Sequence, residues 1–440
     1  MITRGREFSG VLPPEEMLLS VISEHNARRE RYALLRDYYL GKNAVLSRRR
    51  AQGLPNNRIA HCFARYIVTV TSGYLTGNGI TYRAGGEDRE ALDGILDLYR
   101  KSDISSVDGE LARNAAIYGK GVELITVPED GILPRAYALD PMSAFVVYDE
   151  DIRHEPLFGV YLTDKRDGTG SVTGRKALVF TDSAIAEYAL DGKRCSFVRR
   201  DPHFFGRVPM VEYWNDESEK GDFEWVIPLI DAYDSLQSDR LNDKDQFADK
   251  LLVLTGCTLD TDEEGRPPWL QLRMDKALCL PDGDADARYL TGEMNESGNE
   301  ILRSSLERDI HKLSLVPDLS DDHFSGNVSG VAMKYKLMGL EQLMAMKQKW
   351  FSEGLRERMR LMGNYMRLRG GKPLEVRNVV IGYTRPLPEN LSETASVIKT
   401  AREAGAVSTR TMVEMLHGSD WDESMIEDET RQVKEEKHGR

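Results

Sequence analysis

Two long helical patterns that flank a short insert constrain this chain most. The first covers residues 226–254, and its apolar positions fall near one face: Ile230, Tyr233, Leu236, Leu241, Phe247 and Leu251. At ~1.5 Å per residue such a helix would span roughly 40 Å. The second covers residues 296–315, with Leu302, Leu306, Ile310 and Leu313 on one stripe. A strand-and-turn region at 256–294 separates them, so the sequence predicts a stalk of two helices with a small tip.

The chain before this stalk changes from helical to strand patterns. Helical spacing predicts helices over residues 14–40, 57–75, 88–101 and 105–118. Between about 120 and 215, short runs rich in Val, Tyr, Phe and Leu alternate with turns. The predicted strands are Val122–Val127, Ala144–Tyr148, Gly159–Thr163, Ala177–Thr181 and Ser196–Arg200. We therefore expect an α+β fold in which a meander of antiparallel strands packs on helices.

The chain after the stalk begins with a helix stop at Val316-Pro317 and a polar loop at 318–330. A long helix over 331–369 follows, rich in Lys and Arg, with three glycines at which we expect it to kink: Gly339, Gly354 and Gly363. Its basic residues predict either a solvated face or pairing with acids of a neighbouring subunit. A strand over Val376–Tyr383, a short helical hairpin over 391–417 that turns at Gly405, and an acidic tail complete the prediction.

Composition limits the kinds of partner. The 440 residues predict two to four domains, and the formal charge of −13 argues against tight binding to nucleic acid. Either DNA is not a partner, or DNA passes without adhering. No stretch approaches the ~18–20 apolar residues of a membrane helix, and the N-terminus lacks a signal-peptide pattern. We expect a soluble protein that is made in the cytoplasm and has no membrane partner.

No motif in the chain carries enzymatic chemistry. Asp282, Asp284, Asp286 and Glu293 have the spacing of a calcium loop, but Ala287 stands where the sharp turn needs glycine. Gly119-Lys120-Gly121 lacks the spacing of a phosphate loop and reads as a turn before a strand. The four cysteines and eight histidines are scattered without ligand spacing. We therefore expect no enzyme, no metal and no cofactor.

One segment resembles a known family. It runs V-P-D-L-S-D-D-H-F-S-G-N-V-S-G-V-A-M-K-Y-K-L from Val316 to Leu337, and it is similar to the corresponding stretch of siphophage portal proteins. Further matches follow in the family's order: Asn57-Arg58-Ile59, Gly73-Tyr74-Leu75, Asp140-Pro141, Gly206-Arg207-Val208-Pro209, Asp231-Ala-Tyr-Asp234 and Pro388-Glu389-Asn390. The resemblance covers residues from about 10 to 425.

This resemblance implies a portal-like fold and a division of the chain into family regions. These are a wing (1–225, with 332–390 contributing), a stem of two helices (226–255 and 296–316), a small α/β clip (256–295), a tunnel loop (317–331) and a crown (391–440). It also implies a cyclic homo-oligomer, typically of twelve subunits, at one capsid vertex. Double-stranded DNA would be packaged and ejected through this ring without sequence-specific contacts.

The resemblance also implies partners and candidate site residues. The large terminase, a head-completion or adaptor protein, and the major capsid and scaffolding proteins would dock on the virion ring, which is assembled in the host bacterial cytoplasm. Candidate channel-loop residues are Asp321, His323, Ser325, Asn327 and Ser329. Candidate channel or ring charges are Lys334, Lys336, Asp309 and Glu307. Candidate clip docking residues are Trp269, Arg273, Asp282 and Asp284.

Two other functions stay open on the sequence alone. The first is a different virion structural protein, such as a head–tail adaptor or a minor capsid component. The second is a nuclease-like enzyme whose acids at 282–293 bind metal. An acidic channel lining would suit a conduit, because each neutralised phosphate adds affinity and therefore friction.

Overall fold

The computed structural model of the chain describes most of its residues, and the description below concerns those alone. They are 1–5, 12–52, 54–86, 88–129, 131–192, 194–248, 251–255, 286–290, 296–319, 335–384, 391–417 and 423–438. The chain forms two compact units. The first unit comprises Met1–Gly41, Cys62–Ile227 and His311–Arg440, and the second comprises Lys42–His61 and Pro228–Ile310.

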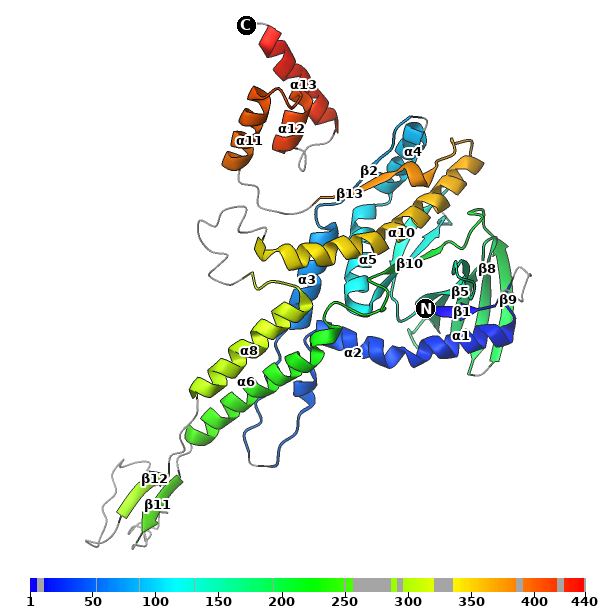
Figure 1. The fold of residues 1–440 in the computed structure, drawn as a ribbon. Helices are drawn as coiled ribbons and strands as arrows, with labels where there is room; N and C mark the ends of the chain where they lie inside the picture. The colour runs from blue at the N-terminus through cyan, green and yellow to red at the C-terminus, as the bar shows by residue number, and fades with distance from the viewer. Residues whose placement is uncertain are drawn as a thin grey trace. The chain divides into compact units, whose positions relative to one another are not determined.

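The first unit has an α+β fold, in which runs of helices and runs of strands follow one another along the chain (Figure 1). Its helices before the strands are α1 (Glu15–Ala27), α2 (Arg29–Tyr39), α3 (Phe63–Thr76), α4 (Asp88–Lys101) and α5 (Ile104–Tyr118). The predicted helix over 14–40 is interrupted at Arg28, and the one predicted from residue 57 begins only at Phe63. The other two predicted helices are confirmed within one residue.

Four of the five predicted strands lie in the larger sheet, which has the strand order β1-β5-β6-β7-β8-β9, whereas the one predicted at Val122–Val127 belongs to a smaller sheet. Its strands are β1 (Ile2–Arg4), β5 (Ala144–Asp149), β6 (Pro156–Arg166), β7 (Val172–Phe180), β8 (Ala184–Asp191) and β9 (Arg194–Pro202). The short strand β1, which was not predicted, pairs in parallel with β5. Leu18, Val21 and Ile22 of α1 are buried against Phe145 and Phe158 of the sheet, so α1 covers one of its faces.

A smaller sheet holds β10 (Met210–Trp214), β3 (Lys120–Thr126) and β4 (Arg135–Leu139) in that order, all antiparallel. The long helix α10 (Met338–Leu368) packs on β10 and also contacts α3 and α4. A separate pair joins β2 (Ile80–Arg83) to β13 (Val380–Tyr383), which η3 (Val376–Asn378) precedes. The strand predicted over Val376–Tyr383 therefore begins four residues later, at Val380.

The chain's last helices confirm the predicted hairpin. They are α11 (Leu391–Glu403), α12 (Thr409–His417) and α13 (Glu423–His438), and Gly405 turns the chain in a left-handed conformation at φ 67°. The acidic tail is helical as α13. The helix α10 runs as one element of 31 residues through all three of its glycines. The kinks expected at these glycines stay a prediction.

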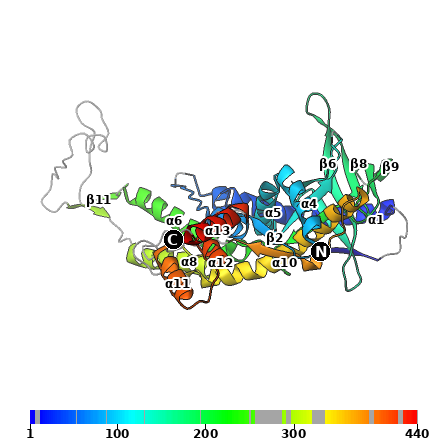
Figure 2. The same cartoon turned by 90° about the horizontal axis from the view of Figure 1, so that it is seen from above.

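The second unit contains most of the two predicted long helices, while Ile227 and the last turn of the second helix, from His311, belong to the first unit. These helices are α6 (Ile227–Ala248) and α8 (Glu296–Ser314), which lie side by side in both views (Figures 1 and 2). The first ends earlier than predicted, because β11 (Leu251–Thr255) begins there and pairs with β12 (Asp286–Leu290). Residues 42–61, with the short η1 (Ala44–Ser47), belong to this unit although the sequence placed them in the region 1–225.

Candidate functional site: the anchored loop ends and the paired helices

Most of the candidate residues fall outside the described part of the chain. Those of the predicted channel loop and its flank are Asp321, His323, Ser325, Asn327, Ser329 and Lys334, and those of the predicted clip are Trp269, Arg273, Asp282 and Asp284. The structure does place Glu307 and Asp309 on α8, where both are half-buried, and Lys336, which is exposed. The described part of the site consists of the elements before and after the loop, which are α8 and α10.

A tyrosine of α3 holds the chain where it leaves α8 toward the loop. The hydroxyl of Tyr66 donates a hydrogen bond to the carbonyl oxygen of Pro317 at 2.7 Å and accepts one from the amide of Leu319 at 2.9 Å. Burial raises the pKa of Tyr66, so the group stays a neutral phenol that can both donate and accept.

His311 reinforces this attachment from the last turn of α8. Its Nδ1 donates to the carbonyl oxygen of Val316 at 2.9 Å, because a carbonyl can only accept. Its ring stands edge-on to Tyr66 at 5.6 Å between centroids and to Phe63 at 6.0 Å. Val316 itself is fully buried. Two side chains thus secure three backbone groups at the start of the loop.

The other end of the loop returns to the same helix. The hydroxyl of Tyr74, eight residues after Tyr66 on α3, donates to the carboxylate of Glu341 in the first turn of α10. A Cβ atom placed on Gly339 would lie 3.6 Å from Cδ2 of Leu315, so the chain returns beside its point of departure. The segment between these residues is therefore closed at its base.

Ion pairs join the two long helices of the second unit. Arg240 of α6 binds Glu296 at 3.0 Å and Glu300 at 3.2 Å, both on α8. Arg303 then binds Glu300 at 2.7 Å and Glu307 at 2.6 Å along α8 itself. The carboxylate of Glu307, a candidate channel charge, is therefore engaged in this ladder. The hydrogen bond with Glu300 raises the pKa of Arg303 and keeps that cation charged.

A row of polar side chains on α6 holds an extended segment. Asp234, Ser238 and Asn242 are fully buried and occupy positions i, i+4 and i+8. They accept hydrogen bonds from alternate amides: His61 to Asp234 at 2.9 Å, Ile59 to Ser238 at 3.0 Å, and Asn57 to Asn242 at 2.6 Å. Four helical residues rise ~6 Å and two extended residues ~6.7 Å, so the two spacings match.

This row explains why the helix predicted from residue 57 begins later. Residues 57–61 donate their alternate amides to α6 instead of forming a helix. The sequence does contain a sign of this row, because three small polar residues occur at a spacing of four within a long helix. Their spacing alone does not identify the segment that they bind. Nearby, Arg48 and Arg50 of the basic stretch both bind Asp239, so these arginines serve the same attachment.

The basic helix α10 directs some of its charges inward. Arg358 is fully buried, and its guanidinium donates to Glu123 and to Asp108, each at 2.7 Å. Glu123 also accepts from the hydroxyl of Tyr213 at 2.7 Å. Burial by itself would lower the pKa of Arg358, but the two carboxylates outweigh it and raise that pKa well above its ordinary value.

A second buried pair corrects the prediction for this helix further. Lys347 of α10 binds Asp222 at 2.5 Å, and both side chains are almost fully buried. The prediction of a solvated face or of pairing with a neighbouring subunit was therefore wrong for Lys347 and Arg358, which are paired within their own chain. The sequence could not show this, because the acids come from distant elements. The helix also buries Phe351, whereas Tyr335 before it is 73% exposed.

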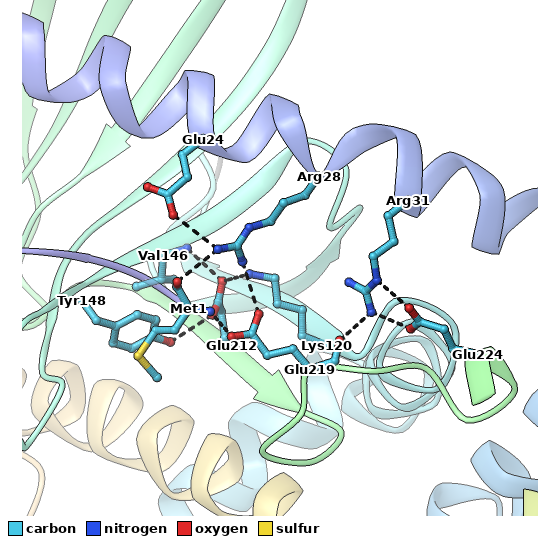
Figure 3. A network of polar contacts seen from close by, with 10 residues as sticks. All are labelled: Met1, Glu24, Arg28, Arg31, Lys120, Val146, Tyr148, Glu212, Glu219 and Glu224. Carbon is cyan, nitrogen blue, oxygen red and sulfur yellow. Dashed lines mark hydrogen bonds and ion pairs between the residues drawn. The ribbon is translucent and has the colours of Figure 1, made fainter.

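Lys120 of the Gly119-Lys120-Gly121 motif is likewise part of the core (Figure 3). Its ammonium binds Glu212 at 2.6 Å, and Glu212 also accepts from the amide of Val146 at 3.0 Å. Gly119 ends α5 in a left-handed conformation, and β3 begins at Lys120. The prediction of a turn before a strand is therefore confirmed. Around this pair, Figure 3 shows Arg28 reaching Glu24 and Glu219, and Arg31 bound to Glu224.

The calcium-like pattern meets a strand. Asp286 and Ala287, its fifth and sixth positions, begin β12 and pair with β11. A calcium loop needs a sharp turn at the sixth position, so this backbone argues against the enzyme hypothesis. Among the described residues no group of three His, Cys, Asp or Glu side chains could hold a metal ion. None of the described helices is long and apolar enough to cross a membrane.

Comparisons of the sequence with known proteins identify the family of the chain. The family profile "Phage portal protein, SPP1 Gp6-like" matches residues 18–439. The portal protein of Bacillus phage SPP1 is 25% identical over 435 residues, covering 91% of this chain and 83% of that protein. The portal protein of Clostridium phage phiCD119 is 21% identical over 461 residues and covers 96% of both. A solved structure of the neck of an empty GTA particle, computed with C6 symmetry, aligns with a TM-score of 0.46 at 14% identity, covering 87% of this chain and 92% of that one.

The chain belongs to the phage portal protein family, SPP1 Gp6-like. It is accordingly a structural component of a phage virion, one subunit of the homo-oligomeric ring at a capsid vertex through which DNA is packaged and ejected. The resemblance drawn from residues 316–337 is thereby confirmed. The head–tail adaptor hypothesis gives way to the portal.

Proposed function

We propose that twelve copies of this chain form the ring, with the loop at 317–331 facing DNA in its channel. The observation that carries this proposal is the closed base of the loop. Tyr66 binds the start of the loop and Tyr74 binds Glu341 in the helix that follows it, so the chain is attached to one helix both before and after this polar segment. A segment of that kind can follow the grooves of a passing duplex without tight base contacts.

The remaining regions follow from the same proposal. The paired helices α6 and α8 form the stem, and residues 256–295 between them form the clip. The ion-pair ladder from Arg240 to Glu307 supports the stem assignment, because it fixes the two helices against each other. The wing comprises residues 1–225 with 332–390, which belong to the first unit except for residues 42–61, and α11, α12 and α13 form the crown.

The finer partners are also part of the proposal. The clip would dock the large terminase during packaging and the head-completion protein afterwards, through Trp269, Arg273, Asp282 and Asp284. Major capsid and scaffolding proteins would surround the ring as it assembles in the host cytoplasm. The formal charge of −13 per subunit supports a conduit that DNA passes without sticking, because unneutralised phosphates gain little affinity. We propose no catalytic activity for the chain.

Imaging of the purified protein tests the ring directly. We expect closed rings of twelve subunits in negative stain and a matching mass in native mass spectrometry. A protein that stays monomeric at high concentration would contradict the proposal. The loop is tested separately by replacing Asn327 and Ser329 with alanine, which should leave rings intact but reduce DNA packaging. The matched control replaces Ser105 and Ser106, which lie in α5, with alanine.

A further inference from the structure

The start of the loop is held in a strained backbone conformation. Leu315, the residue after α8, has φ 58°, a left-handed conformation that is strained for a residue other than glycine. Such a conformation persists only where neighbouring contacts determine it. Here those contacts are the burial of Val316 and the hydrogen bonds of the next residues to Tyr66 and His311.

Tyr66 makes the contact closest to the loop. Its hydroxyl bonds two backbone groups, the carbonyl of Pro317 and the amide of Leu319, which lie on either side of Asp318. Proline also restricts the residue before it to extended conformations, so Val316 leads into this clamp with little freedom. The direction in which the chain enters the loop therefore depends on one phenolic oxygen.

The ring of Tyr66 makes a packing contact that differs from the hydrogen bonds of its hydroxyl. It packs edge-on against His311, and this packing does not involve the oxygen that binds the loop. Removing the oxygen alone should therefore keep α3 and the end of α8 in place while it releases the backbone at Pro317 and Leu319.

We propose that Tyr66 is a positioning residue for DNA translocation: its hydroxyl sets the direction in which the channel loop leaves α8. This inference rests on the proposed function of the loop at 317–331. It assigns to α3, a helix of the first unit, the task of aiming an element that itself contacts DNA.

The test is Tyr66→Phe, studied in assembled rings. Hydrogen exchange, read by mass spectrometry over a peptide spanning 315–319, should show the Leu319 amide exchanging about fivefold to tenfold faster, because it loses its partner. Rings should keep their subunit number and thermal midpoint. The fraction of particles filled with DNA should fall severalfold when they carry the variant.

The matched control is Tyr137→Phe, which removes the same atom from a 40% exposed tyrosine on β4. It should leave both the exchange and the packaging as in the unmodified protein. Unchanged exchange at Leu319 in the Tyr66 variant would overturn the inference, as would faster exchange with normal packaging.

The Asn327 and Ser329 variants separate this inference from the proposed function. If they impair packaging while Tyr66→Phe does not, the loop acts on DNA but Tyr66 does not position it. If neither affects packaging, the loop's proposed function fails, and the positioning role fails with it. Loss of packaging in both, with intact rings, supports the two together.

Discussion

Arg358 is a buried cation whose partners lie far away in the sequence. It lies in the second half of α10 and binds Asp108 of α5 and Glu123 of β3. Its guanidinium carbon also lies over the rings of Tyr99 and Tyr213, at 5.7 and 5.5 Å from the centroids. Each charge here is acceptable only because the opposite charges accompany it into the core.

Replacing Arg358 by methionine should therefore destabilise the protein strongly. The change keeps the apolar volume but leaves two buried carboxylates without a cation, which should cost about 3–5 kcal/mol in the free energy of unfolding. Guanidinium unfolding at fixed protein concentration measures this. The control on the same helix is Arg356→Met, since Arg356 pairs with the 67% exposed Glu353 and should cost no more than about 0.5 kcal/mol. Equal losses in both variants would contradict the assignment.

His25 makes the stability of the first unit depend on pH. Its ring is fully buried and stacks on Phe145 at 4.3 Å, and its Nε2 donates to the carbonyl oxygen of Met142 at 3.1 Å. Burial lowers the pKa of His25 from 6.5 to about 4. Between these two values the unfolded chain binds a proton that the folded chain does not.

The free energy of unfolding should therefore fall as pH decreases from 6.5 to 4, by roughly 3 kcal/mol from this residue. His25→Gln keeps a donor for Met142 but cannot be protonated, so it should show a shallower decrease over the same range. Urea unfolding at pH 7, 5.5 and 4 compares the two proteins. The prediction fails if their pH dependences coincide.

At the scale of elements, the glycines of α10 show what packing requires of a helix. A Cβ on Gly354 would lie 2.5 Å from Cδ1 of Tyr213, whereas a Cβ on Gly363 would lie 3.7 Å from its nearest neighbour, Ile95. The first distance is an overlap and the second an ordinary contact. Gly354 is thus needed for the close approach of α10 to β10.

The two glycines accordingly predict opposite effects of the same change. Gly354→Ala should lower the free energy of unfolding by about 1–3 kcal/mol, because the added methyl group displaces the Tyr213 ring. Gly363→Ala should raise it by about 0.5–1 kcal/mol. Position 363 lies in a helix interior that alanine can adopt, and alanine lowers the conformational entropy that the unfolded chain loses on folding. Thermal unfolding of both variants under identical conditions decides the matter. A stabilised Gly354 variant would mean that the helix has room there.

Elements whose patterning is local were predicted well. The spacing of apolar residues located α4 and α5 within one residue, and the alternating runs located the strands from β5 to β7. Residues 57–61 were predicted wrongly, since their backbone amides bind α6 rather than one another. Local propensity cannot anticipate a competing partner that lies about 180 residues later in the chain.

At the scale of the molecule, the two compact units do not follow the order of the chain. Residues 42–61 belong with Pro228–Ile310, so the chain enters the second unit twice. The row from Asp234 to Asn242 explains the first entry in physical terms, because its buried acceptors need donors. Among the candidate site residues, the structure places Glu307 in an ion-pair ladder. The channel-loop and clip residues stay predictions.

The sequence by itself determined the α+β class and most of the longer helices and strands, and the segment from Val316 to Leu337 was enough to indicate the family. Only the tertiary structure decided where the charges go. Arg358 finds its acids 235 and 250 residues away, and Lys347 finds Asp222 at a separation of 125. Periodicity is a property of neighbouring residues, whereas the partner of a buried charge depends on which distant elements the fold brings together. For the same reason, the polar loop could be predicted from its residues, whereas its attachment could not. Only the structure shows that two tyrosines of α3 bind the chain before and after the loop.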